Sequence, residues 1–476
     1  MTGSSERLLI AALAWGALSF GAVYPWAYWP LAAACAAIGV QGIVVTRGWT
    51  NDRLRKLAIG LGAVGLAIAL QTIDLPYGMT TRLSPGLAPF FREYAFAYQP
   101  PATHPLSIDP DATLVVLGLF TAFSLFLVGL TANIRYTRLN WLVYQIIGLG
   151  VALSVIGVVQ KALIDPMQPL VYGFWKPLRG GNPFGPFINR NHFAGWMIMA
   201  LPLVAGYSCA VLAATWKPQP NFAARLRWLT TVEASQAVPP MFCALLMGMA
   251  LALTGSRSGV AGFAVAMLVF GFFAVRRLKE RRARLLLGGY LLVIVVGAIA
   301  WAGTDMALVR FMTARSDSPG RLTAWRDALH IFMDFPWFGI GLGTFGKAML
   351  VYQSASRPWM YAQAHNEYLQ LLAEGGLLVL IPSLVVVSLV IGGIRRRLTA
   401  DADQPLTWWI RIGAIAGLAG IAAQSAVEFS LQMPGNTALF VLLLALAMHR
   451  PRSQSRRSSS SARVRPFSTH GLAHRI

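Results

Sequence analysis

Charged residues are scarce in this chain, and acidic residues are the scarcest of them. Asp and Glu together number 18 among 476 residues, and all charged residues make up 12% of the sequence. Soluble globular domains carry about 25% charged residues, so this composition excludes an ordinary soluble protein. The few acidic residues include no pair with the spacing of a divalent-cation site, and we therefore predict no metal.

Cysteine is also rare. The three cysteines, Cys35, Cys209 and Cys243, all fall in apolar runs, where small core residues belong, and we predict no disulfide. The sequence contains no Cys/His set with metal spacing, no P-loop and no Gly-x-Ser-x-Gly motif. The glycines from Gly339 to Gly343 lack the βαβ pattern that surrounds a dinucleotide site. We expect no nucleotide and no other cofactor.

Long apolar runs are what the chain has in abundance. Hydrophobic residues make up 56% of the sequence, and runs of roughly 20 apolar residues recur along its whole length. A β-barrel would show short alternating segments instead, so we predict an all-α polytopic membrane protein with about 12 transmembrane helices. The expected spans are residues 8–24, 27–46, 57–73, 112–131, 140–161, 192–213, 238–254, 259–275, 285–302, 368–393, 406–427 and 436–449.

The basic residues set the orientation of these spans. A net charge of +22 can indicate nucleic-acid binding, but here the basic residues form short clusters between apolar runs, which is the positive-inside pattern. The clusters in 47–56, 276–282 and 395–397 are then cytoplasmic, and so are both termini. The N-terminus has one basic residue, Arg7, and no small-residue cleavage site, so we expect a retained first helix.

This pattern divides the chain into four parts. Residues 1–302 hold the first nine predicted helices with short loops, and residues 303–366 form a large loop, or cap, on the outer side. Residues 367–449 hold the last three helices. The Ser/Arg-rich residues 450–476 lack a core-forming pattern and are predicted to be a disordered cytoplasmic tail that contacts anionic lipid.

The cap is predicted to contain amphipathic helices, of which residues 321–334 are the clearest. Its apolar side chains recur at helical spacing, so we expect this face either to pack on the membrane domain or to roof a cleft, with Arg321 pointing into that cleft. The stripe consists of Leu322, Trp325, Leu329 and Phe332.

Arginines on the outer side are the first candidates for chemistry, because the orientation rule disfavours them there. Arg190 and Arg257 both stand at outer ends of predicted spans, and the cap adds Arg310, Arg315, Arg321, Arg326 and Arg357. They either snorkel to lipid headgroups or pair with a carboxylate, or they line a cationic cleft. Because guanidinium grips phosphate oxygens bidentately, we favour a cleft for a lipid-linked phosphate or diphosphate.

His365 is the second candidate, since it stands where the cap turns into the span at 368–393. A neutral imidazole there can accept a proton from an attacking hydroxyl. The alternative is an interfacial histidine or a hydrogen bonder at the helix start. We expect structural roles for His192, next to Arg190, and a surface position for His330.

Four segments, in this order and in this span pattern, resemble the O-antigen ligase and polymerase superfamily of bacterial inner-membrane glycosyltransferases. They cover about residues 180 to 380, and none is specific alone. The segments are Phe187-Ile188-Asn189-Arg190-Asn191-His192-Phe193-Ala194-Gly195, Thr254-Gly255-Ser256-Arg257-Ser258-Gly259, Arg321 to Phe345 with its Pro-Trp-Phe-Gly turn, and His365-Asn366 followed by Leu369, Glu374 and Gly376.

The resemblance implies a periplasm-facing, metal-independent enzyme of the Gram-negative inner membrane. Its donor would be a glycan linked to undecaprenyl diphosphate, and its acceptor the lipid A-core oligosaccharide. His365 would be the general base, and Arg190, Arg257 and Arg321 would bind the diphosphate. The supporting residues expected beside them are Asn366, Asn191 and Tyr368.

Single displacement of the diphosphate should invert the anomeric centre. An O-antigen polymerase or a protein O-oligosaccharyltransferase would use the same donor, and both alternatives stay open. A transporter or flippase belongs to a different class. It is disfavoured because the chain shows no inverted repeat and few acidic residues within spans.

Overall fold

The structure is a computed structural model, and it is mostly helical. It describes residues 3–47, 51–95, 97–134, 139–163, 170–177, 181–215, 221–277, 281, 284–285, 288–289, 321–354, 360–400 and 404–449. The cap arginines 310, 315 and 357, nearly all of the predicted span 285–302 and the tail from residue 450 lie outside these residues.

Long apolar helices dominate the described part of the chain. Eight of them are long and apolar enough to cross a membrane. This supports a polytopic α-helical membrane protein, whereas the number of about 12 spans stays a prediction. The eight are α2 (Pro25–Thr46), α6 (Pro110–Asn133), α7 (Leu139–Leu163), α8 (Arg190–Thr215), α10 (Val232–Leu253), α11 (Arg257–Arg277), α15 (Glu367–Ala400) and α16 (Pro405–Ser425).

Shorter helices occupy three further predicted spans. These are α1 (Gly3–Leu18), α3 (Asp52–Leu70) and α17 (Pro434–Met448). The outward faces of the bundle are apolar as well. On α15 the side chains of Ile381, Leu384 and Val385 are 58%, 56% and 52% exposed. An apolar surface of this kind is suited to lipid rather than water.

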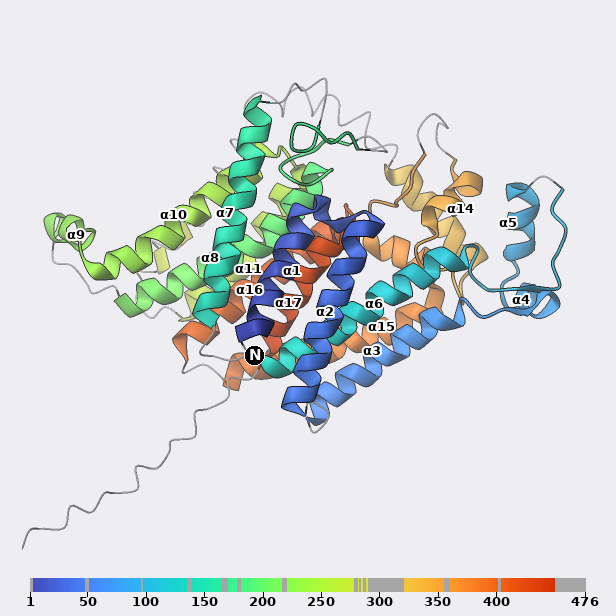
Figure 1. Cartoon of the computed structure of the whole chain (residues 1–476), viewed down its shortest axis with the longest axis horizontal. Coiled ribbons are helices and arrows are strands. Elements are labelled where there is room, and N and C mark those ends of the chain that lie inside the picture. Colours follow the sequence, from blue (N-terminus) through green and yellow to red (C-terminus); the bar gives the residue numbers. More distant parts are fainter. Residues whose placement is uncertain are drawn as a thin grey trace, which may run out of the picture.

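The core of the bundle is built on close contact between α8 and α16 (Figure 1). Glycines make this approach possible, because a Cβ at Gly206 would lie 2.4 Å from the Trp409 carbonyl oxygen. A Cβ at Gly413 would lie equally close to the carbonyl oxygen of Pro202, at 2.4 Å. Small residues at helix contacts are what allow such packing within membranes. Both helices are therefore rigid supports for whatever their ends carry.

A second, smaller core lies at one end of the bundle, where α4, α5 and α14 gather (Figure 1). The segment after α3 forms a short hairpin with two helices, and it packs on the cap residues 321–352 through apolar side chains of both segments. We call this the cap unit. Its elements are β1 (Leu75–Pro76), α4 (Tyr77–Leu83), α5 (Leu87–Tyr94), β2 (Thr103–His104) and α14 (Phe345–Tyr352).

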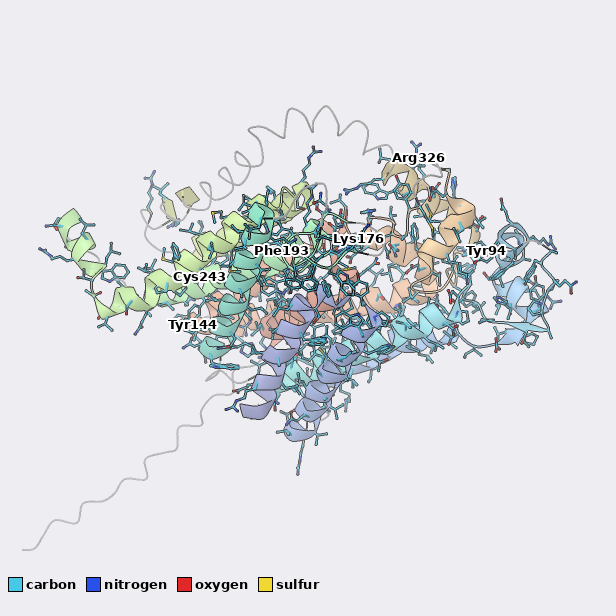
Figure 2. The ribbon with its side chains drawn as sticks, turned by 45° about the horizontal axis from the view of Figure 1, so that its top comes forward. Tyr94, Tyr144, Lys176, Phe193, Cys243 and Arg326 are labelled. Carbon is cyan, nitrogen blue, oxygen red and sulfur yellow. The ribbon has the colours of Figure 1, made fainter. Side chains whose placement is uncertain are left out.

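Figure 2 shows Tyr94 and Arg326 on the cap unit, apart from Phe193 among the long helices. The segment after α3 and the cap residues thus meet at one end of the molecule. The remaining short elements are η1 (Phe20–Ala22), α9 (Phe222–Trp228) and η4 (Ser430–Gln432). The three cysteines are free.

Residues 321–334 are helical as predicted, but the predicted packing face is wrong. Leu322 and Leu329 are 51% and 42% exposed. The buried face instead carries Ala324, Ala328 and Ile331. The two alanines let this helix lie close to its neighbours, so small residues rather than the large apolar ones mark the contact.

Candidate functional site

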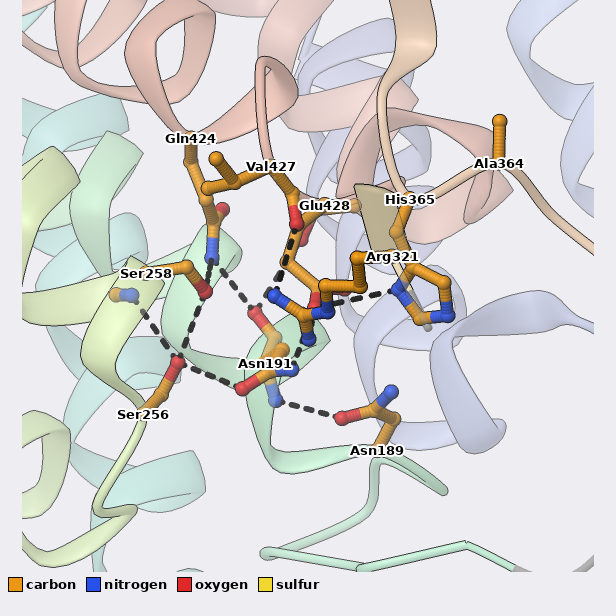
Figure 3. A network of polar contacts seen from close by, with 12 residues as sticks. Asn189, Asn191, Ser256, Ser258, Arg321, Ala364, His365, Gln424, Val427 and Glu428 are labelled. Atoms are coloured by element: carbon orange, nitrogen blue, oxygen red, sulfur yellow. Dashed lines mark hydrogen bonds and ion pairs between the residues drawn. The ribbon is translucent and has the colours of Figure 1, made fainter. Parts of the chain in front are cut away.

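Glu428 is the centre of a polar network at the C-terminal end of α16 (Figure 3). It stands in the turn between α16 and η4, and its side chain is 0% exposed. The Oε1 atom accepts hydrogen bonds from Asn191 Nδ2 at 2.8 Å and from Arg321 Nη2 at 2.9 Å. His365 Nδ1 lies 3.4 Å from the same oxygen. We call these four residues the Glu428 cluster.

His365 is held in an unusual backbone conformation. Its φ is 51°, a left-handed value that non-glycine residues seldom adopt and that is often found at functional sites. The ring makes an edge contact with Phe429, with centroids 4.9 Å apart. One ring nitrogen faces Glu428 while the other points away from the network (Figure 3). The side chain is 26% exposed, so a substrate can reach it.

Arg321 enters the cluster from the first described turn of the helix over 321–334. Besides its contact with Glu428, its Nη1 donates to the Val427 carbonyl oxygen at 3.4 Å. The side chain is 39% exposed, so part of the guanidinium remains available to a ligand. Arg321 thus reaches from the cap helix to the turn that follows α16.

Asn191 is oriented by a serine from another helix. Ser256 Oγ donates to Asn191 Oδ1 at 2.7 Å, which turns the amide nitrogen toward Glu428. Ser256 is itself buried, and its Oγ accepts from the backbone N–H of Gly259 at 3.0 Å. This last contact makes Ser256 the N-cap of α11.

Three helices begin around the Glu428 cluster. Asn189 caps α8, since its side chain accepts from the Asn191 N–H at 2.9 Å. Ser256 caps α11, and Asn366 caps α15 by accepting from the Tyr368 and Leu369 N–H groups, each at 3.1 Å. A helix N-terminus carries about half a positive charge and free N–H groups, so this end of the bundle is suited to anions.

Arg190 and Arg257 are the first residues of α8 and α11. Arg190 is half-buried and directly precedes Asn191 in the chain. Arg257 is exposed and directly follows Ser256. A cation at a helix N-terminus opposes the helix dipole, so these arginines do not serve helix stability. Their placement adds two positive charges to a region that already favours anions.

The pKa of the Glu428 carboxyl reflects this surrounding charge. Burial raises it, but the His365 imidazole, the Arg321 guanidinium and the His192 ring together bring it below its ordinary value of 4.5. Glu428 is therefore ionised at neutral pH. It is an anion held at the positive ends of the helices.

The structure brings together three of the predicted site residues, Asn191, Arg321 and His365. The other two supporting candidates have local roles, because Asn366 caps α15 and the Tyr368 hydroxyl donates to the Ala422 carbonyl oxygen at 2.7 Å. Neither contacts the cluster through a hydrogen bond in the described part of the chain.

The central residue of the site, Glu428, was not among the sequence candidates, although a lone acid between two apolar runs of so basic a chain is a usable signal. His192 was expected to be structural. It is buried, and its ring lies 4.7 Å from Phe429, on which His365 also packs.

The glycine turn from Gly339 to Gly343 is structural. All three glycines have positive φ, and the Gly343 N–H donates to Glu374 Oε2 at 3.0 Å. The Gly341 N–H donates to the Glu374 carbonyl oxygen, also at 3.0 Å. These N–H groups are therefore engaged within the fold. Among the described residues, no three His, Cys, Asp or Glu side chains are grouped to hold a metal ion.

One long segment of the chain matches a known protein family. Residues 242–384 match the family model described as O-antigen ligase. The matched segment contains Ser256, Arg257, Arg321 and His365, whereas Asn191 and Glu428 lie outside it. No curated protein matches the chain.

Proposed function

We propose that this chain, in which residues 242–384 match the O-antigen ligase family model, transfers O-antigen glycan from undecaprenyl diphosphate to the lipid A-core oligosaccharide. The reaction takes place on the periplasmic side of the inner membrane, with both termini in the cytoplasm. The observation that carries this proposal is the meeting of Arg321 and His365 beside three helix N-termini at one end of an apolar bundle, where two of the helices begin with Arg190 and Arg257.

The arginines and helix ends suit a diphosphate. Arg190 and Arg257, with the exposed part of Arg321, can bind its oxygens bidentately and stay charged at any physiological pH. As the glycosidic bond breaks, negative charge grows on the leaving oxygen, and preorganised cations stabilise that charge. Diphosphate is already a good leaving group, so we assign no separate general acid and no metal.

His365 supplies the base. The acceptor hydroxyl attacks the anomeric carbon, and its proton moves to the outward ring nitrogen of His365. The new C–O bond forms as the bond between the anomeric carbon and the diphosphate oxygen breaks. Undecaprenyl diphosphate leaves with the electron pair. A single displacement of this kind inverts the anomeric centre, and retention seen by NMR in the product would contradict it.

Deletion of the gene in its host, followed by gel analysis of the lipopolysaccharide, tests the function. Loss of all long chains, with carrier-linked polymer accumulating, is the expected result. Core carrying a single repeat would identify a polymerase instead. Normal lipopolysaccharide together with unglycosylated proteins would identify a protein O-oligosaccharyltransferase.

A further inference from the structure

We propose that Glu428 is the positioning carboxylate of His365. It holds Nδ1 so that the other ring nitrogen faces the acceptor, and its negative charge stabilises the imidazolium that forms when the proton is taken. The inference rests on the proposed function, in which His365 is the base. It adds a residue that lies outside the segment matched to the family.

Glu428 is fully buried although it is an acidic residue. Its side chain is 0% exposed, in a chain with only 18 acidic residues. A buried carboxylate is unfavourable unless it is fully paired. Here Oε1 receives all the contacts, while Oε2 is buried and has no hydrogen-bond partner in the part of the chain that the structure describes. An incompletely satisfied buried acid calls for a reason other than stability.

The Glu428 carboxylate is also fixed from two sides. Asn191 donates to it and is itself held by Ser256 at 2.7 Å. Arg321 donates to it and is also bonded to the Val427 carbonyl oxygen. These contacts fix the position of the Glu428 carboxylate. The other side chain at ion-pair distance from it is His365.

The His365 imidazole is oriented toward this carboxylate. Nδ1 lies 3.4 Å from Glu428 Oε1, slightly beyond a normal hydrogen bond. Catalytic hydrogen bonds are often long in the free enzyme and shorten when substrate binds. Phe429 packs edge-on against both His365 and His192, at 4.9 and 4.7 Å between centroids.

The alternative is that Glu428 merely anchors Arg321. The two roles differ in how the reactivity of His365 depends on pH. The charged and titratable groups facing His365 are Glu428, Arg321 and His192. Among them only Glu428 favours the protonated ring. If Glu428 acts on His365 directly, removing its charge should lower the pH midpoint of the His365 reaction in the Arg321→Met background as well, where an anchor for Arg321 no longer matters.

The test compares Glu428→Gln with Glu374→Gln in the purified full-length chain. Glu374 is a second buried glutamate, which accepts backbone N–H groups within the fold and lies outside the cluster. Diethyl pyrocarbonate modifies neutral imidazole, and mass spectrometry of the peptide that contains His365 gives the pH midpoint of the reaction. We expect Glu428→Gln to lower this midpoint by about one pH unit and to lower kcat by about 10–100-fold. Glu374→Gln should leave the midpoint unchanged.

Glu428→Asp keeps the charge and supplies a second variant if Glu428→Gln does not fold. It should keep the midpoint near that of the wild type. A midpoint that stays the same in Glu428→Gln, or that falls equally in Glu428→Asp, would overturn the proposal. The modification assay does not depend on glycan transfer by the protein. If the wild type fails to transfer glycan while the midpoint still depends on Glu428, the proposed function fails and the His365–Glu428 pair stands.

Discussion

Substituting Arg321 with Met removes the guanidinium while keeping an apolar side chain of similar length, and it leaves the buried Glu428 with fewer partners. Breaking a fully buried ion pair costs about 3–5 kcal/mol. Arg321 is 39% exposed, so water screens its side of the pair. Asn191 also continues to donate to Glu428 Oε1, at 2.8 Å. We therefore expect Arg321→Met to lower the free energy of unfolding by about 1–2 kcal/mol.

The assay is a double-mutant cycle on the midpoint of thermal unfolding in one detergent. For a chain of this size, such a destabilisation lowers the unfolding midpoint by a few degrees, about 2 °C per kcal/mol. In the Glu428→Gln background, Arg321→Met should have almost no effect, because no buried charge remains to be paired. Arg326→Met, an exposed arginine on the same helix, is the matched control. An equal effect of Arg321→Met in both backgrounds would show that the ion pair is not the source of the stability.

Three further predictions follow from the cluster and its supports. Because the pKa of Glu428 is lower in the folded protein than 4.5, its carboxylate contributes stability that is complete above that pH and is lost as pH falls through the lowered value. The unfolding midpoint should therefore fall more steeply on acidification in the wild type than in Glu428→Gln, and parallel curves would refute this. Ser256→Ala frees the Asn191 amide and should lower transfer about 10-fold, whereas Ser388→Ala, which removes a hydroxyl bonded within α15, should not; equal rates in the two variants would contradict the orienting role. Gly341→Ala should destabilise the protein by about 1–3 kcal/mol, since φ is +102° and the new Cβ would lie 2.1 Å from a serine Oγ; an unchanged unfolding midpoint would show that this turn can rearrange.

The sequence predicted the helices well because hydrophobic periodicity and length are local properties. It also placed Arg190 and Arg257 at helix starts, where the structure has the first residues of α8 and α11. His365 was found because a histidine at the junction between a polar loop and an apolar run is visible in the chain itself.

The centre of the site was not visible in this way. Glu428 meets Arg321 across 107 positions and Asn191 across 237, so its role arises only from the tertiary fold. The packing face of residues 321–334 was also predicted wrongly. The large apolar residues of this helix predicted its buried face, whereas the structure buries Ala324 and Ala328.

The role of the glycine turn at Gly339–Gly343 was not visible in the sequence either. Its N–H groups bond Glu374 in α15, and this contact joins the cap unit to the helix that follows His365. A long-range contact of this kind has no signature in local spacing.

The most direct test of the account measures glycan transfer by the purified chain in liposomes. The liposomes contain O-antigen linked to undecaprenyl diphosphate and lipid A-core acceptor, and excess chelator is present throughout. The wild type should form long-chain product, and His365→Ala, although folded, should lose at least about 100-fold in rate. Near-normal transfer by His365→Ala would contradict the central claim that His365 is the base.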